Sequence, residues 1–128
     1  MRALVADRSA TTRRVVIRAL RVVGVQDVLE FPDAHTATPA LAGAPDLVVL
    51  EWSTSDDDAL QLIGELRARD GGAQARVILL SERDRRPDLD RAIALDIQGY
   101  LLKPFEPRSL IELLAAAMQP GGSGAEAA

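Results

Sequence analysis

The sequence predicts an α/β fold in which helices cover both faces of a parallel, five-stranded sheet. Two observations favour this fold. Short apolar runs typical of buried strands alternate along the chain with segments whose apolar residues recur at helical spacing. In addition, 128 residues suffice for one domain with one sizeable core. Because strands and helices alternate, we expect right-handed crossovers and the strand order 2-1-3-4-5.

The predicted strands are short and apolar. They cover residues 2–6, 27–31, 46–50, 75–80 and 99–102. The third of them, "DLVVL", is followed directly by an acid, Glu51. A carboxylate at the tip of a buried strand indicates a functional role for that tip.

The first helical segment has two distinct faces. Its apolar face consists of Val15, Val16, Ala19, Leu20 and Val23. Arg14, Arg18 and Arg21 lie on the opposite face, and Gly24 is expected to end the helix.

The other helices follow the later strands. Residues 33–43 contain Pro39, so this helix should be short or kinked. The acids at 56–58 precede a helix whose dipole favours negative charge at its start. A short helix is expected at 87–96, and Pro107 should open the last one.

A doubly wound sheet of this order is a flavodoxin-like fold, which carries its functional crevice beyond the carboxyl ends of the strands. Asp7 and Arg8 follow the first strand, and Glu51 follows the third. Ser81 follows the fourth strand and Lys103 the fifth. We therefore expect these five residues to meet at one edge of the sheet.

Composition excludes several classes of protein. The formal net charge of −4 disfavours a nucleic-acid surface, and the absence of cysteine excludes disulfides and thiolate metal sites. No apolar run is long enough for a membrane span, and the N-terminus lacks a signal-peptide pattern, so we expect a cytoplasmic protein. Residues 1–119 are expected to form the domain, with 120–128 a flexible tail or the start of a linker.

Four motifs at these strands resemble the receiver domains of bacterial two-component response regulators. The motifs are "LVADRSATTRRVV", "PDLVVLEW", "VILLS" and "GYLLKPF", and the resemblance covers about residues 2–118. It implies phosphotransfer from a donor histidine to an aspartate at the tip of the third strand. It also implies Mg²⁺ held by acids and a backbone carbonyl, and a Ser or Thr and an aromatic residue that switch the partner surface.

The sequence departs from that pattern where the chemistry takes place. Asp7 matches the first acid of the family, but Arg8 stands at the second acid and Glu51 at the phosphoacceptor. Ser53 falls where the metal-ligating carbonyl is expected. The family pattern is kept at Ser81, Tyr100, Lys103 and Pro104.

Two hypotheses follow for the altered residues. The Arg8 guanidinium is expected to pair with Asp7 or Glu51 and to take the place of the cation. Glu51 is either a poor phosphoacceptor, displaced by one methylene, or a mimic of phosphoaspartate that reaches Ser81 and Lys103.

Ordinary structural roles remain open for several of these residues. Asp7 could be only a helix cap, and Ser81 only a turn residue. Tyr100 could be plain core, and "ERDRR" at 82–86 is typical of a solvated loop.

The expected function is that of a degenerate receiver, a pseudo-receiver in two-component signalling, which is no enzyme and needs no cofactor. The alternative is a Mg²⁺-dependent, phosphorylatable receiver that controls a transcriptional or other output. A flavodoxin-like enzyme for a small ligand is disfavoured because "ADRSATTRR" is no glycine-rich phosphate loop. By analogy with the family, partners should bind the fourth helix, fifth strand and fifth helix, about 87–118. Candidates are a sensor kinase, an output domain or a second copy of the chain; nucleic acid and membranes are not expected.

Overall fold

The computed structural model of the chain describes residues 1–119, so the expected tail at 120–128 lies outside the described residues. All five strands pair in parallel in the order β2-β1-β3-β4-β5, which confirms the predicted fold. The strands are β1 (Arg2–Ala6), β2 (Asp27–Phe31), β3 (Leu47–Trp52), β4 (Arg76–Ser81) and β5 (Gly99–Leu102). The helices are α1 (Ala10–Val22), α2 (Ala34–Ala37), α3 (Asp58–Ala68), α4 (Arg86–Ile93) and α5 (Pro107–Ala117), with 3₁₀ turns η1 (Thr38–Gly43) and η2 (Gly72–Gln74).

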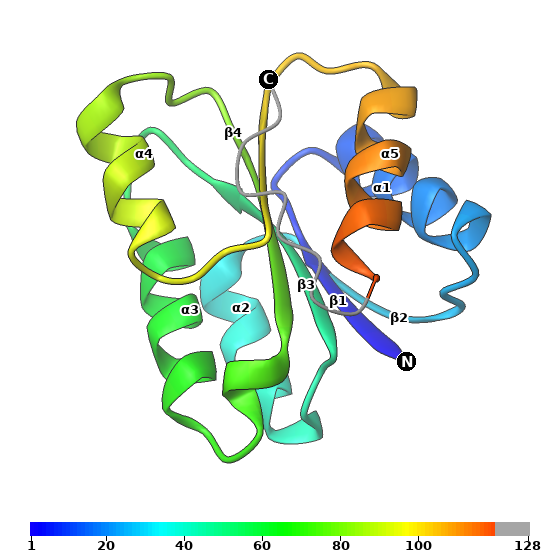
Figure 1. The fold of residues 1–128 in the computed structure, drawn as a ribbon, viewed down its shortest axis with the longest axis horizontal. Helices are drawn as coiled ribbons and strands as arrows, with labels where there is room; N and C mark the ends of the chain where they lie inside the picture. Colours follow the sequence, from blue (N-terminus) through cyan, green and yellow to red (C-terminus); the bar gives the residue numbers. More distant parts are fainter. Residues whose placement is uncertain (120–128) are drawn as a thin grey trace.

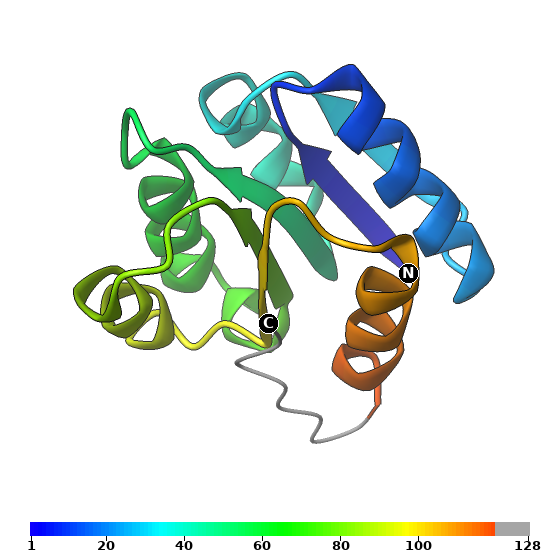
Figure 2. The same ribbon diagram turned by 90° about the horizontal axis from the view of Figure 1, so that it is seen from above.

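The helices form a layer on each face of the sheet. α1 and α5 pack together on one face, and α2, α3 and α4 cover the other (Figure 1; Figure 2 shows the layers from above). Each face buries its own apolar cluster. Val16 and Leu20 of α1 meet Leu110 and Leu114 of α5 in one cluster, and the second contains residues of α2, α3 and α4. The central strands β1, β3 and β4 are buried almost throughout, as expected for a sheet covered on both faces.

The boundaries of β3, β4 and α4 differ from the sequence-based expectation. β4 covers residues 76–81 rather than 75–80, because Ser81 still pairs with Trp52 of β3 and Leu102 of β5. β3 runs beyond residue 50 to Trp52 because Glu51 and Trp52 still pair with β4. The segment 33–43 breaks into α2 and η1 next to Pro39, as its proline predicted. α4 ends at Ile93, and the chain turns at Asp96 with a left-handed φ of 58°.

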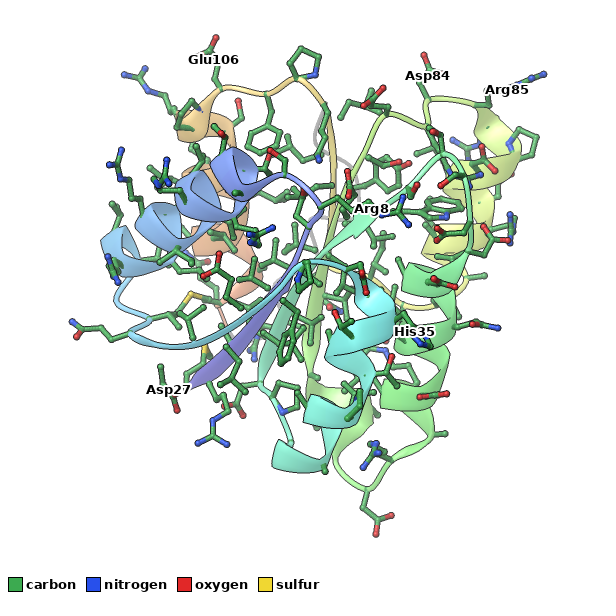
Figure 3. The ribbon with its side chains drawn as sticks, turned by 180° about the vertical axis from the view of Figure 1, so that it is seen from behind. Arg8, Asp27, His35, Asp84, Arg85 and Glu106 are labelled. Atoms are coloured by element: carbon green, nitrogen blue, oxygen red, sulfur yellow. The ribbon has the colours of Figure 1, made fainter. Side chains whose placement is uncertain are left out.

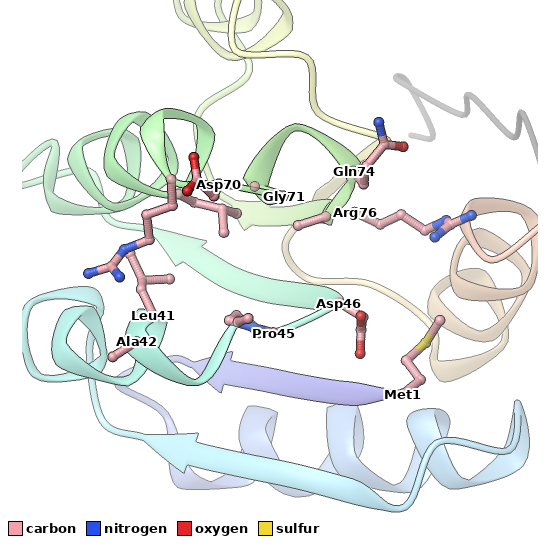
Figure 4. Close-up of a pocket in the computed structure, with 14 residues that line it drawn as sticks. Met1, Leu41, Ala42, Pro45, Asp46, Asp70, Gly71, Gln74 and Arg76 are labelled. Atoms are coloured by element: carbon pink, nitrogen blue, oxygen red, sulfur yellow. The ribbon is translucent and has the colours of Figure 1, made fainter.

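A shallow pocket of about 590 Å³ lies at the edge where the strands begin (Figure 4). Met1, Pro45, Asp46 and Arg76 line it, and these residues come at or just before the starts of β1, β3 and β4. The polar residues that follow the strands lie at the other edge. Within the described residues, none of the helices has the length and apolar character needed to cross a bilayer.

Candidate functional site

Lys103 joins the two acids at the carboxyl edge of the sheet. Its Nζ lies 2.8 Å from Asp7 Oδ2 and 2.8 Å from Glu51 Oε2. The side chain of Asp7 is fully buried, and those of Lys103 and Glu51 are only 14% and 19% exposed. The expectation that β1, β3 and β5 deliver these three groups to one place is confirmed. Lys103 is also the chain's single lysine, so no other side chain carries an ammonium group.

Asp7 is held at the start of α1 by the backbone around it. Its Oδ1 accepts a hydrogen bond from the Ser9 N–H at 2.8 Å, and its carbonyl accepts one from Arg13 Nη1 at 2.7 Å. Ser9, not Asp7, caps the helix by accepting from the Thr12 N–H. Burial raises the pKa of Asp7 above its ordinary value, although Lys103 and the Ser9 N–H oppose that rise.

Glu51 is the more strongly ionised of the two acids. Burial opposes its charge, but Lys103 and the backbone N–H of Arg8, which donates to Oε1 at 3.1 Å, together hold its pKa below the ordinary value. Burial likewise opposes the charge of Lys103, yet its two carboxylate partners raise the pKa of the ammonium group. Lys103 is therefore a cation held between two acids, one ammonium group against two carboxyl groups.

The hydroxyl of Ser81 forms hydrogen bonds with backbone groups of two other residues. Its Oγ donates to the Trp52 carbonyl at 2.9 Å and accepts from the Arg83 N–H at 3.0 Å. The phosphoaspartate-mimic hypothesis expected Glu51 to reach both Ser81 and Lys103. Glu51 does contact Lys103, but its other bond is to the Arg8 N–H and not to Ser81.

Tyr100 is buried with its ring turned toward the site. Its hydroxyl donates to the Arg83 carbonyl at 2.7 Å, and its ring meets that of Trp52 edge-on at 6.4 Å. Burial raises the pKa of the phenol, which therefore stays protonated and donates. Tyr100 thus packs in the core and also bonds to the loop between β4 and α4.

Arg8 points away from the acid pair and toward the β3–α3 loop. Its Nη2 lies 2.6 Å from Asp56 Oδ2, and its Nη1 donates to Ser53 Oγ at 2.8 Å and to Ser55 Oγ at 3.2 Å. The predicted pairing of the guanidinium with Asp7 or Glu51 is wrong; Glu51 receives only the backbone N–H of Arg8. Figure 3 shows Arg8 at the carboxyl edge of the sheet. Arg8 makes these contacts because the short loop after β3 brings Asp56 and two serine hydroxyls within reach of its guanidinium.

Arg83 contributes to the site although the sequence did not single it out as a candidate residue. Its guanidinium lies over the Trp52 ring, 4.3 Å from the centroid, and is 16% exposed at the side chain. Its Nε and Nη2 donate to the Ser53 carbonyl at 3.0 and 2.8 Å, and Nη2 also donates to the Asp56 carbonyl at 3.2 Å. The expectation of a solvated loop at 82–86 is therefore wrong for this residue. Arginine on a face of tryptophan is a favourable cation–π arrangement.

A second layer of charges surrounds this contact. Trp52 Nε1 donates to Asp57 Oδ1 at 3.2 Å, and Arg91 Nη2 donates to Asp57 Oδ2 at 2.7 Å. Arg83 also lies 3.4 Å from Asp88 at the start of α4. The β3–α3 and β4–α4 loops are thus tied together across Trp52, an arrangement we call the Arg83 clamp (Arg83, Trp52 and the Ser53 carbonyl). A lone tryptophan after an apolar strand and an arginine-rich loop were its only signals in the sequence.

Comparison with known proteins agrees with the fold. The family model of the response regulator receiver domain matches residues 3–115. The chain belongs to this family. Chemotaxis protein CheY-3 of Vibrio cholerae is 30% identical to this receiver domain over 115 residues, covering 89% of the chain and 88% of the relative. The CheY homolog of Campylobacter jejuni is 30% identical over 128 residues, with 98% of each chain covered.

Solved structures give the same fold. CheY4 of Vibrio cholerae has a TM-score of 0.79 at 19% identity, covering 91% of this receiver domain and 98% of that chain. A response regulator from Burkholderia multivorans has a TM-score of 0.75 at 27% identity, covering 94% and 97%.

The groups that receiver domains offer to Mg²⁺ have other partners in this one. Asp7 and Glu51 contact Lys103, the Ser53 carbonyl accepts two bonds from Arg83, and Arg8 adds a cation at the second acid's position. Within residues 1–119, no group of three His, Cys, Asp or Glu side chains is placed to hold a metal ion. A divalent cation prefers several free oxygen ligands. The residues as arranged do not fit it.

The position of Arg8 leads to a first prediction. Its side chain is 51% exposed, so its ion pair with Asp56 is screened by solvent. We expect Arg8→Ala to lower the free energy of unfolding by no more than about 1 kcal/mol, measured by urea denaturation in EDTA. A loss of about 3 kcal/mol or more would instead indicate a desolvated pair with Asp7 or Glu51.

Proposed function

We propose that this receiver domain is a pseudo-receiver that signals through protein contacts and takes no phosphoryl group. The observation that carries the proposal is the contact of Lys103 with both Asp7 and Glu51. In a receiver of the usual kind this lysine balances the incoming phosphoryl charge. Here the glutamate carboxylate already reaches the ammonium group, at 2.8 Å.

Two further features support loss of phosphotransfer. Glu51 places its carboxylate one methylene farther from the backbone than aspartate would, and a misplacement of about 1 Å can cost on the order of 100-fold in rate. Arg83 uses the Ser53 carbonyl, and Arg8 introduces positive charge where the family has an acid. On this proposal the domain is not an enzyme and works without a metal cofactor.

The contacts also favour a single, active-like state. Glu51 takes one of the two partners that a phosphoryl group would take, Lys103 but not Ser81, and Tyr100 is turned inward to the Arg83 carbonyl. A permanent conformation would let the face formed by α4, β5 and α5 bind an output domain or a second copy of the chain without a preceding signal. Ile93 on α4 is 38% exposed and offers an apolar contact on that face.

The alternative is Mg²⁺-dependent phosphorylation at Glu51, as in a working response regulator. Family membership and the partial exposure of Glu51 favour it. The two relatives are named chemotaxis proteins, and a chemotaxis-type role would fit this alternative. A cytoplasmic location and a sensor kinase as the phosphoryl donor would fit it as well.

Magnesium binding separates the two proposals. Trp52 is the chain's single tryptophan and follows Glu51 directly, so its fluorescence reports on the site. We expect millimolar Mg²⁺ to leave the emission of the wild type unchanged. The double variant Arg8→Asp/Glu51→Asp serves as the positive control and should show saturable quenching. Saturable quenching of the wild-type emission by Mg²⁺ would favour the alternative, provided that a potassium salt supplying the same concentration of positive charge does not quench it.

A further inference from the structure

Lys103, Asp7 and Glu51 bring an amine and two carboxyl groups together in a site that excludes most water. The Nζ atom of Lys103 lies 2.8 Å from a carboxyl oxygen of each acid, and the side chain of Asp7 is fully buried. An amine and a carboxyl group can condense to an amide with loss of water. Burial favours that product, because a neutral amide replaces two charged groups.

The two acids contact the amine in different ways. Glu51 Oε2 accepts a hydrogen bond from Lys103 Nζ, so a proton of the ammonium group points at that oxygen. Asp7 Oδ2 touches Nζ without the angles of a hydrogen bond, and no other group bonds to this buried atom. Asp7 Oδ1 accepts from the Ser9 N–H at 2.8 Å, which stabilises negative charge on that oxygen. Glu51 is therefore placed to take a proton, and Cγ of Asp7 is placed to be attacked.

We propose that Lys103 and Asp7 condense to an intramolecular isopeptide bond, with Glu51 as the proton acceptor. Glu51 takes a proton from the ammonium group, and the freed electron pair of Nζ attacks Cγ of Asp7. The Nζ–Cγ bond forms and the Cγ–Oδ2 bond breaks. Of the three protons on the ammonium group, two pass by way of Glu51 to the departing oxygen, which leaves as water. The third stays on the amide nitrogen, and no oxidant or reductant is needed.

The fold contributes proximity to this reaction, and the charge of Lys103 slows it. Groups held in contact with their reacting atoms aligned can reach effective concentrations on the order of 10⁵ M or more. The first proton transfer is unfavourable, because two neighbouring carboxyl groups stabilise the ammonium form. The fresh protein should therefore hold the ion pair, and the covalent bond should accumulate on prolonged incubation.

The bond would join the tips of β1 and β5, which are not neighbours in the sheet. It closes the chain between residues 7 and 103, so the unfolded state loses conformational freedom. The cross-linked domain should therefore unfold at a higher urea concentration than the same domain without the bond. The proposal goes beyond the loss of phosphotransfer and is tested without acetyl phosphate. A domain that never forms the bond can still be a pseudo-receiver.

The test is the intact mass of the wild-type domain, measured when fresh and after prolonged incubation. We expect a species lighter by one water molecule to accumulate. Trypsin should release from it a branched peptide in which residues 3–8 are joined to residues 92–108. An unchanged mass would overturn the proposal, and so would a branch to residues 22–67, which contain Glu51. Loss of water without a branched peptide, as succinimide formation at Asp70–Gly71 would give, would overturn it too.

Amide variants separate the roles of the two acids. In Asp7→Asn the attacked carbon carries an amide, so the same bond should release ammonia instead of water. Glu51→Gln keeps Asp7 but removes the proton acceptor, so the product should form roughly 100-fold more slowly. Asp90→Asn, at an acid of α4 that is 58% exposed, is the matched control and should lose water at the wild-type rate. Loss of water from Asp7→Asn at that rate would contradict the proposal. The wild-type branched peptide decides it even where a variant does not fold.

Discussion

Replacing Lys103 by methionine is expected to lower the free energy of unfolding by about 3–5 kcal/mol at pH 7, because two largely buried carboxylates lose the cation between them. Asp7 is fully buried at its side chain and Glu51 is 19% exposed, so solvent can compensate little of that loss. Methionine keeps the length and apolar character of the lysine stem, which limits the effect of lost packing. Urea denaturation of both proteins measures the difference.

The deficit should depend on pH with a definite sign. Without Lys103, the pKa of each carboxyl in the folded protein rises above its unfolded value. A group of this kind destabilises the fold progressively as the pH rises through that interval. The deficit of the variant is therefore largest near neutrality and shrinks as the pH falls toward the ordinary values of 3.8 for Asp7 and 4.5 for Glu51.

A compensated variant serves as the control for Lys103. In Asp7→Asn/Glu51→Gln/Lys103→Met the uncompensated charges are gone, so much of the lost stability should return. A single Lys103→Met variant within about 1 kcal/mol of wild type at pH 7 would contradict the account of the acid pair.

Arg83→Ala is expected to cost about 2–3 kcal/mol and to loosen the β4–α4 loop, because it removes charged hydrogen bonds to two carbonyls and the contact with Trp52. Urea denaturation gives the stability. Amide hydrogen exchange should become faster at position 83, whose N–H donates to Ser81 Oγ at 3.0 Å just after the end of β4. The emission of Trp52 should also change, since its ring loses the cation 4.3 Å away.

Arg91 provides a matched control for the Arg83 clamp. It is also an arginine near the Trp52 ring, at 5.6 Å, but its side chain is 49% exposed and its bond is to the exposed Asp57. Arg91→Ala should therefore have a much smaller effect on both stability and exchange. If the two variants behave alike, the Arg83 clamp does not hold the loops together.

The sequence predicted the architecture and the meeting of Asp7, Glu51 and Lys103, because parallel strands place all their carboxyl ends at the same edge of the sheet. It also placed Pro107 as the first residue of α5. These features depend on apolar periodicity and backbone chemistry, which are local and strong signals.

The partners of the arginines could not be predicted in the same way. Arg8 has several acids within the reach of its long side chain, and only the path of the β3–α3 loop selects Asp56 over Glu51. Arg83 stands in an arginine-rich loop, and its contact with Trp52 depends on how two loops approach in space. Such contacts join residues about 30 positions apart, as with Arg83 and the Ser53 carbonyl, for which the sequence has no periodic signal.

The most direct test of the central claim is incubation with acetyl phosphate and Mg²⁺, followed by intact-mass measurement. The wild type is compared with Arg8→Asp/Glu51→Asp and with the same variant carrying Arg83→Ala, which also frees the Ser53 carbonyl. We expect no added phosphoryl group on the wild type, a gain in the double variant and a larger gain in the triple variant. A wild-type protein that gains one phosphoryl group, and loses it when Glu51 is changed to Gln, would contradict the pseudo-receiver account.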